Sequence, residues 1–154
     1  MRPFTQWLRV SPDVGDLLFR VLFSLIFVGL GLEHLLDDHL IQALMPEWLP
    51  FKRPLSIGAG LVLLAGGLSL MLGFRIHLGA TVLAFFLIAV TLVIHVPALF
   101  HRPPGLPTDW GWLWDVFQRS NLFKNLCLLG GCIHLVDHEV GRFSLDGRAR
   151  RAAR

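Results

Sequence analysis

Five side chains that can donate, accept or relay a proton lie in or at the ends of hydrophobic stretches of this chain. They are Glu33, His34, His95, Lys124 and Asn125. An ionisable side chain costs about 2.5–3.5 kcal/mol at the centre of a bilayer on insertion scales, so those that persist there are candidates for function. Two imidazoles, a carboxylate, an ammonium and an amide supply the donors and the proton relay that a quinone headgroup needs beside an apolar slot.

A second set of polar residues falls near the opposite ends of the same stretches: Arg20, His77 and His134. Three different hydrophobic runs therefore contribute polar groups at each end. Two bland alternatives stay open for these residues. Lys124 and Arg20 can snorkel to the membrane surface, and each histidine can serve as a hydrogen-bonded structural residue.

The composition indicates lipid as the solvent. Hydrophobic residues make up 54% of the 154 positions and charged residues only 16%, a balance that a soluble domain of this size does not show. A short soluble chain exposes too much of its area to hide so many apolar side chains. We therefore expect a single integral membrane domain over residues 1–154.

Four runs are close to the roughly 20 residues that cross a hydrocarbon core. They cover residues 15–36, 56–73, 76–96 and 121–136. Only helices can span lipid as an open chain, because their backbone groups bond internally. The pattern predicts an all-α, four-transmembrane-helix up-and-down bundle, with a long, partly helical outer loop between the third and fourth helices. The first run is followed by charged residues and no small-residue cleavage site, so we expect it to remain as an anchor.

The distribution of Lys and Arg predicts the orientation. Eight of these residues flank the side that holds both termini, and four flank the other. The excess of positive charge favours N- and C-termini in the cytoplasm. The eight are Arg2, Arg9, Arg75, Arg142, Arg148, Arg150, Arg151 and Arg154. The basic C-terminal tail is expected to lie against anionic lipid headgroups, and no nucleic-acid partner is expected.

Two further patterns suggest packing surfaces. Trp110, Trp112 and Trp114 suit a membrane-interface belt or a lid on the mouth of the bundle, with ligand stacking as the sharper alternative. Ala65, Ser69 and Gly73 have the small-xxx-small spacing that lets helices approach closely, either within the bundle or against a partner protein.

The cofactor stays open. Glu33, His34 and His95 have ligand types suited to zinc or iron, but no H-x-x-x-H or E-x-x-H spacing supports a metal site, and no metal is predicted. Axial haem ligation by the two histidines is a further, less favoured alternative. A quinone is the cofactor that best suits the outer residues.

The order of these features resembles the DoxX family of small four-helix bacterial membrane proteins. The resemblance rests on Arg20 early in the first span, Glu33-His34 at its end, the "MPEWLP" connection and the Gly-rich second span ending in "LGFR". His95 closing the third span and "KN" at Lys124-Asn125 with a later Gly pair complete it. The resemblance implies a bacterial inner-membrane protein, quinol-oxidase-subunit-like, that is associated with redox metabolism.

Three hypotheses for function follow. The first is a quinone-linked subunit or accessory of a membrane redox complex, with a membrane or peripheral redox protein as partner and no activity as a stand-alone enzyme. The second is a purely structural or assembly subunit. The third is a proton or small-solute pathway through the bundle.

Overall fold

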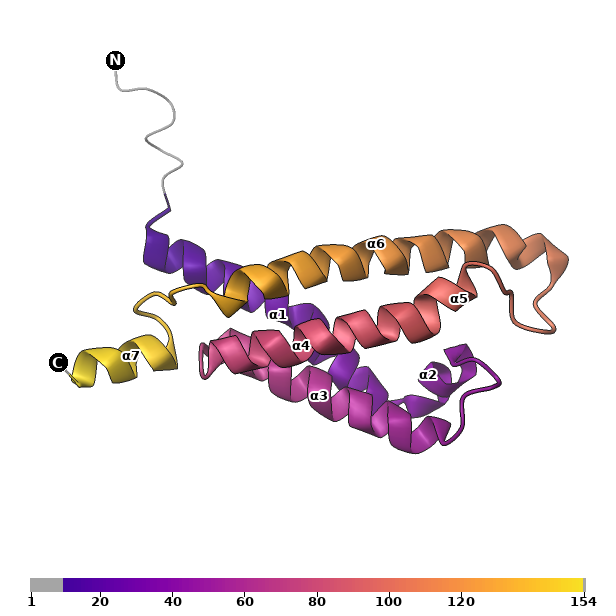
Figure 1. The fold of residues 1–154 in the computed structure, drawn as a ribbon, viewed down its shortest axis with the longest axis horizontal. Coiled ribbons are helices and arrows are strands. Elements are labelled where there is room, and N and C mark those ends of the chain that lie inside the picture. The colour runs from indigo at the N-terminus through magenta and orange to yellow at the C-terminus, as the bar shows by residue number, and fades with distance from the viewer. Residues whose placement is uncertain (1–9, 154) are drawn as a thin grey trace, which may run out of the picture.

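The computed structural model describes residues 10–153, and these residues form helices joined by short connections (Figure 1). Four long helices carry the fold: α1 (Pro12–Leu36), α3 (Lys52–Leu72), α4 (Ile76–Val90) and α6 (Gly111–Val136). Shorter elements are α2 (Asp38–Leu44), the π-helical turn η2 (Thr91–His95), α5 (Val96–Ala98), the 3₁₀ turn η3 (Thr108–Trp110) and α7 (Leu145–Ala152). The expected all-α class is confirmed for the described residues.

Three helical segments are long and apolar enough to cross a membrane within residues 10–153: Pro12–Leu36, Lys52–Leu72 and Ile76–Ala98. Helix α6 is longer than any of them, but it is too polar to count as a candidate span on composition. Its first half carries Asp115, Gln118, Arg119 and Asn121 among its apolar residues. The expectation of four spans is therefore confirmed for three helices only.

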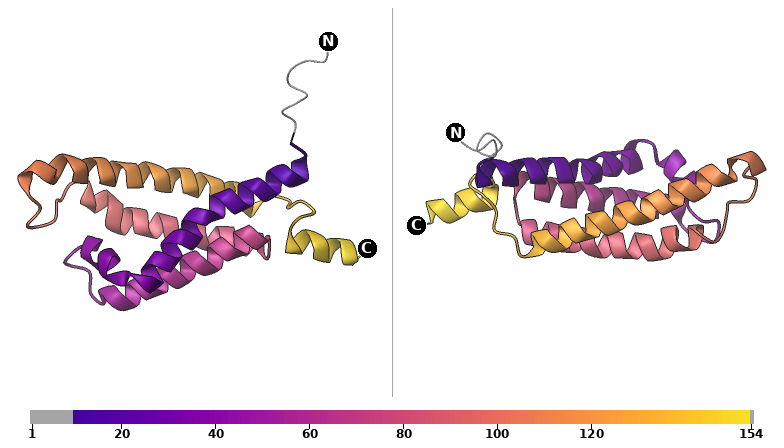
Figure 2. Two further views of the ribbon diagram at one scale, coloured as in Figure 1. Left: turned by 180° about the vertical axis from the view of Figure 1, so that it is seen from behind. Right: turned by 90° about the horizontal axis from the view of Figure 1, so that it is seen from above.

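Consecutive long helices run antiparallel and pack in chain order, α1 on α3, α3 on α4 and α4 on α6 (Figures 1 and 2). One end of the bundle carries residue 10 and α7, and we name it the terminal end. The opposite end carries α2 and α5, and we name it the loop end. Helices α1 and α6 meet near the terminal end, where the Phe19 ring stands edge-on to His134, and they diverge toward the loop end.

The connection before α6 differs from the expected loop over residues 97–120. Helix α6 already begins at Gly111, so the tryptophan-rich segment belongs mostly to its first turns. The chain between α5 and η3 is short and rich in proline, and Arg102 ties it to α6 through Asp115 at 2.6 and 3.2 Å. This ion pair fixes the proline-rich chain against the first turns of α6.

Glycines set the close approach of α1 to α3. A Cβ on Gly31 would lie 3.0 Å from the Gly60 carbonyl oxygen, and a Cβ on Gly60 would lie 2.7 Å from the Cβ of His34. Gly66 faces Leu83 of α4 in the same manner. The small residues of α3 thus serve largely for packing within the chain, although Ala65 is exposed.

The apolar core fills the middle of the bundle. Its buried side chains are Phe27, Leu63, Leu70, Ile76, Ala80, Leu83, Leu87, Cys132, Leu135 and Val140. Many large apolar side chains, including Leu22, Leu61, Phe85 and Phe123, point outward instead. Outward-facing apolar helices around a small core are what a lipid solvent requires.

We expect Gly60→Ala to lower the unfolding temperature, because the added methyl group forces α1 and α3 apart, and overpacking of this kind costs about 1–3 kcal/mol. Gly58→Ala is the matched control, since a Cβ at Gly58 meets nothing within 4 Å. Thermal unfolding of both variants in detergent checks this expectation. Equal unfolding temperatures for the two would contradict the proposed role of Gly60.

Candidate functional site

The most heavily bonded polar group of the structure lies at the terminal end. Arg20 is fully buried, and its Nε donates to Asp16 Oδ2 at 3.0 Å. Its Nη1 donates to the carbonyl oxygens of Leu70 at 3.3 Å and Met71 at 2.9 Å, the last residues of α3. Its Nη2 reaches the Phe143 carbonyl at 3.2 Å. Arg20 therefore does not snorkel: it ties α1 to the end of α3 and to the chain before α7.

Asp16 completes this arrangement from the same helix. Its Oδ1 accepts from His138 Nε2 at 2.8 Å, and its Oδ2 accepts from the Gly141 backbone N–H at 3.1 Å. We name Asp16, Arg20 and His138 the terminal clasp. The Arg20 and Asp16 charges pair with each other and each nitrogen of the guanidinium has an acceptor, which is the condition under which buried ions persist in a protein.

The other two residues predicted near Arg20 lie beside the clasp but outside it. His77 is exposed, and its Nδ1 donates to the Val136 carbonyl at 2.6 Å. His134 is also exposed, and its ring packs 5.2 Å from that of His138. Both residues thus help to hold α6 at the terminal end.

Toward the loop end, polar side chains line the contact between η2 and α6. Asn125 Nδ2 donates to Thr91 Oγ1 at 3.1 Å, and the Nδ1 of His95 lies 3.2 Å from Gln118 Oε1. Lys124 Nζ donates to Asn121 Oδ1 at 2.9 Å. We name this group the polar seam; its members are Thr91, His95, Gln118, Asn121, Lys124 and Asn125.

The π-helical turn positions the seam. In η2 the Val96 N–H bonds to the Thr91 carbonyl, one residue further back than in an α-helix. Pro97 follows directly and has no N–H to continue the regular ladder. The wider turn directs both Thr91 and His95 toward α6. Such π-turns occur often at functional sites.

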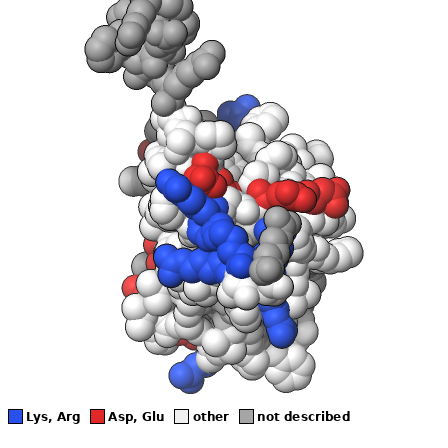
Figure 3. All heavy atoms as spheres, turned by 90° about the vertical axis from the view of Figure 1, so that its left-hand side faces the viewer, with Lys and Arg blue, Asp and Glu red and all other residues white. Residues whose placement is uncertain are grey.

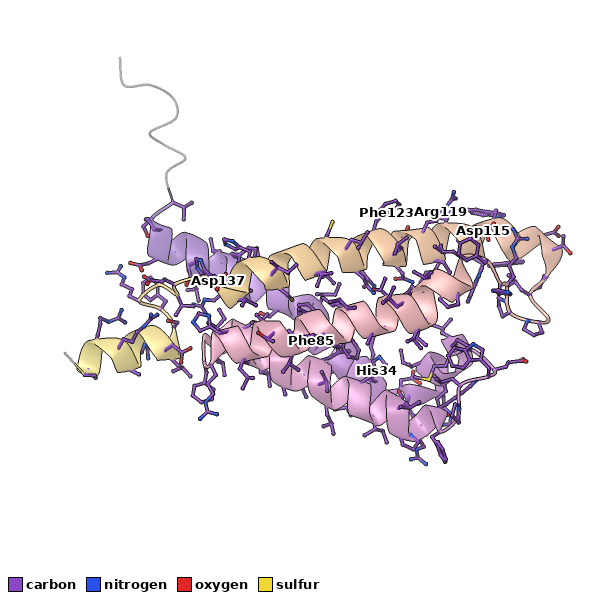
Figure 4. The ribbon with its side chains drawn as sticks, viewed as in Figure 1. His34, Phe85, Asp115, Arg119, Phe123 and Asp137 are labelled. Carbon is purple, nitrogen blue, oxygen red and sulfur yellow. The ribbon has the colours of Figure 1, made fainter. Side chains whose placement is uncertain are left out.

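The five residues predicted as one outer cluster are divided by the structure. His95, Lys124 and Asn125 belong to the seam, whereas the Nδ1 of His34 lies 3.0 Å from Ser56 Oγ, between α1 and α3. Figure 4 labels His34 on this side of the molecule, away from α6. Glu33 is exposed. It forms no ion pair with Lys124 within 4.0 Å in the described residues.

Sequence reasoning named Asn125 but missed Gln118 and Asn121, which are buried beside it on α6. Gln118, Asn121 and Asn125 are only 3%, 8% and 5% exposed. Their spacing of three and four residues places them on one face of a helix, so that signal was available. Arg119 and Phe123 point away on the opposite face (Figure 4). Thr91 and His138 contact residues that are far away in the sequence, Asn125 and Asp16. No local sequence pattern predicts such contacts.

The arrangement offers hydrogen-bond donors and proton carriers more than metal ligands. His34 and His95 bond to different partners on different helices. Within residues 10–153 no three His, Cys, Asp or Glu side chains gather to hold a metal ion. Lys124 and His95 instead present a cationic and an imidazole donor within one apolar interface.

We expect Arg20→Leu to destabilise the protein by about 3–5 kcal/mol, because it removes the buried cation that pairs with the Asp16 carboxylate and the donor to three carbonyl groups. Arg53→Ala is the control. Its ion pair with Asp38 is long, 3.7 Å, and its side chain is 76% exposed, so its loss should cost less than about 1 kcal/mol. Denaturant titration in mixed micelles measures both. Similar losses for the two arginines would refute the structural role of the clasp.

Comparison with known proteins identifies the family. The DoxX family model matches residues 15–96, which is more than half of the chain and covers the segment from α1 through η2 and the first residue of α5. No curated protein and no solved structure matches. The match includes Arg20, Glu33, His34, His77 and His95, while Lys124, Asn125 and His134 lie beyond it. With its membrane-suited helices and this match, the chain belongs to the DoxX family.

Proposed function

We propose that this chain is a quinone-linked subunit or accessory of a membrane redox complex, acting with a redox protein rather than as an enzyme alone. The observation that carries the proposal is the polar seam. Buried amides, a histidine and a lysine are costly in an apolar interface, and here they converge from two helices. Family membership supports a membrane setting for this chemistry.

The residues assigned to quinone chemistry are His95, Lys124 and Asn125 of the seam, with Glu33 and His34 beside it. An ammonium and an imidazole can donate hydrogen bonds to a quinone oxygen and pass protons as it is reduced. Lys124 uses one of its three N–H groups on Asn121, and His95 uses one ring nitrogen on Gln118. Each therefore keeps a further donor or acceptor position.

We further propose that α6 is a fourth span, so that residues 1–154 form one bundle in a bacterial inner membrane with both termini in the cytoplasm. Helix α6 has the length to cross, and its polar face is covered by η2. The terminal end carries exposed arginines (Figure 3), namely Arg75, Arg142, Arg148, Arg150 and Arg151. Arg2, Arg9 and Arg154, counted in the sequence argument, lie outside the described residues.

The topology is tested with alkaline phosphatase, which is active only outside the cytoplasm. We expect an insertion after Gly105 to be active and a fusion after Ala153 to be inactive. Activity at both positions would mean that α6 does not cross the membrane. The opposite pattern would mean that the orientation is inverted.

The redox role is tested on the complex isolated from native membranes. We expect Lys124→Ala and His95→Ala to reduce electron transfer to a soluble quinone analogue at least about tenfold, as loss of a proton-transfer group does, with the partner still bound. Arg119→Ala is the matched control, because Arg119 is a cation on the opposite face of α6. Unchanged turnover in both seam variants would remove the quinone role.

An assembly subunit is the second candidate. An outward groove of about 440 Å³ runs between α3 and α4 and is lined partly by the small residues Ala65, Ser69 and Gly79. Small residues of this kind admit a neighbouring helix. In the same isolation, Ala65→Phe would then lose the partner without loss of folding, whereas Leu22→Phe, on the exposed face of α1, would not. A conducting pathway gains no comparable support, because Phe27, Leu83 and Leu87 fill the bundle between clasp and seam.

A further inference from the structure

A pocket opens at the loop end, above the polar seam. Its volume is about 490 Å³, which lies in the range of sites for small organic ligands. One wall is the segment 43–52, which includes the end of α2, and the other runs from Ile94 to Pro104, with Trp114 of α6 closing one side. The pocket is thus built by two connections that are distant in the sequence.

Hydrogen bonds hold the polar groups of this pocket in place. Trp114 Nε1 donates to the Ala98 carbonyl at 3.2 Å, and Lys52 Nζ donates to the Met45 carbonyl at 3.0 Å. The Arg102 guanidinium is fixed by Asp115. Prolines 46, 97, 103 and 104 line the walls and restrict the backbone. A ligand would therefore meet walls that lose little conformational freedom on binding.

The charges of the pocket indicate what kind of ligand it takes. Asp115 neutralises Arg102, whereas the other two charged side chains of the lining, Lys52 and Glu47, have no ion-pair partner within 4.0 Å among the described residues, so that Lys52 is the cation left to donate to a ligand. Two of the three Lys52 N–H groups remain for a ligand oxygen. Trp48 is 63% exposed and presents its indole to the same pocket. A planar ring bearing carbonyl oxygens can stack on this indole and accept from Lys52, while the remaining lining is mostly apolar.

The pocket adjoins the seam on both helices. Ile94 and Pro97 flank His95 closely in sequence, and Trp114 lies one helical turn before Gln118. Trp114 thus bonds to Ala98, and one turn further along α6 Gln118 bonds to His95. Both hydrogen bonds belong to the same interface between α6 and the η2–α5 segment. A ring in the pocket would lie at the loop-end side of the proton-carrying residues.

We propose that this pocket binds the ring of a quinone, with Trp48 as its stacking partner and Lys52 as the donor to one carbonyl oxygen. The proposal rests on the quinone-linked function proposed above and places the ring outside the seam. His95 then serves as the proton carrier beside the pocket, and Lys124 lies further along α6 within the seam.

Photolabelling of the full chain in lipid nanodiscs with an azido-quinone, competed by a short-tailed benzoquinone, tests this site. We expect displaceable label in residues 43–52 or 94–104. Trp48→Ala should raise the half-saturating concentration roughly three- to tenfold, the range that loss of one aromatic partner corresponds to, and Lys52→Met should raise it similarly. Trp48→Phe should retain binding. Trp112→Ala is the matched control, because Trp112 is 66% exposed and does not line the pocket.

Loss of displaceable label in Trp48→Ala and Lys52→Met, with Trp112→Ala unchanged, supports the pocket. Normal labelling in both pocket variants, with loss in Lys124→Ala, overturns the pocket and leaves the quinone-linked function standing. Absence of displaceable label in the wild type overturns the pocket and the quinone role together. Unfolding temperatures of all variants exclude loss of binding through misfolding.

Discussion

The structure depends first on the burial of one permanent charge. The guanidinium of Arg20 cannot lose its proton in a protein, so it must be compensated where it lies. Asp16 supplies the opposite charge, and the carbonyls at the end of α3 and at Phe143 take the remaining donors. Through this one side chain α1, α3 and the segment before α7 acquire fixed relative positions. The turn after α3 is made by Gly73 in the left-handed region, φ 62°, where a Cβ would clash with Ser144 Cβ and would lie 2.9 Å from Arg20 Nη1.

The remainder of the terminal end is built onto this clasp. Ser144 caps the start of α7 by accepting from the Gly147 N–H. Asp146 then bonds across to the turn between α3 and α4: its N–H donates to the Gly73 carbonyl and its carboxylate accepts from the Ile76 N–H. The basic helix α7 is therefore anchored to the bundle at its first residues. Its arginines are presented at the terminal end because its N-terminus is held (Figure 3).

The polar groups at the loop end are arranged differently. Here Asn125 pairs with Thr91 and His95 with Gln118, side chain to side chain, across a helix–helix contact. The pairing is possible because the π-turn that follows Val90, just before Pro97, brings Thr91 and His95 against α6. Toward the loop end, the same interface includes the hydrogen bond between Trp114 and Ala98, and both residues line the pocket. Apolar side chains such as Phe27, Leu83 and Leu87 lie between the two ends, so that the clasp and the seam are built from different residues.

The sequence by itself determined the helical class and indicated lipid as the solvent, because apolar runs of sufficient length can satisfy their backbone in lipid only as helices. It also carried unused local signals: Asp16 and Arg20 are one turn apart, and Gln118, Asn121 and Asn125 share a helical face. Only the tertiary structure decided which polar groups meet. His138 reaches Asp16, and Ser56 takes His34 away from the predicted cluster, because the glycine-mediated approach of α1 to α3 and the π-turn of η2 set those contacts. Such contacts join residues far apart in the chain, and spacing along a helix holds no information about them.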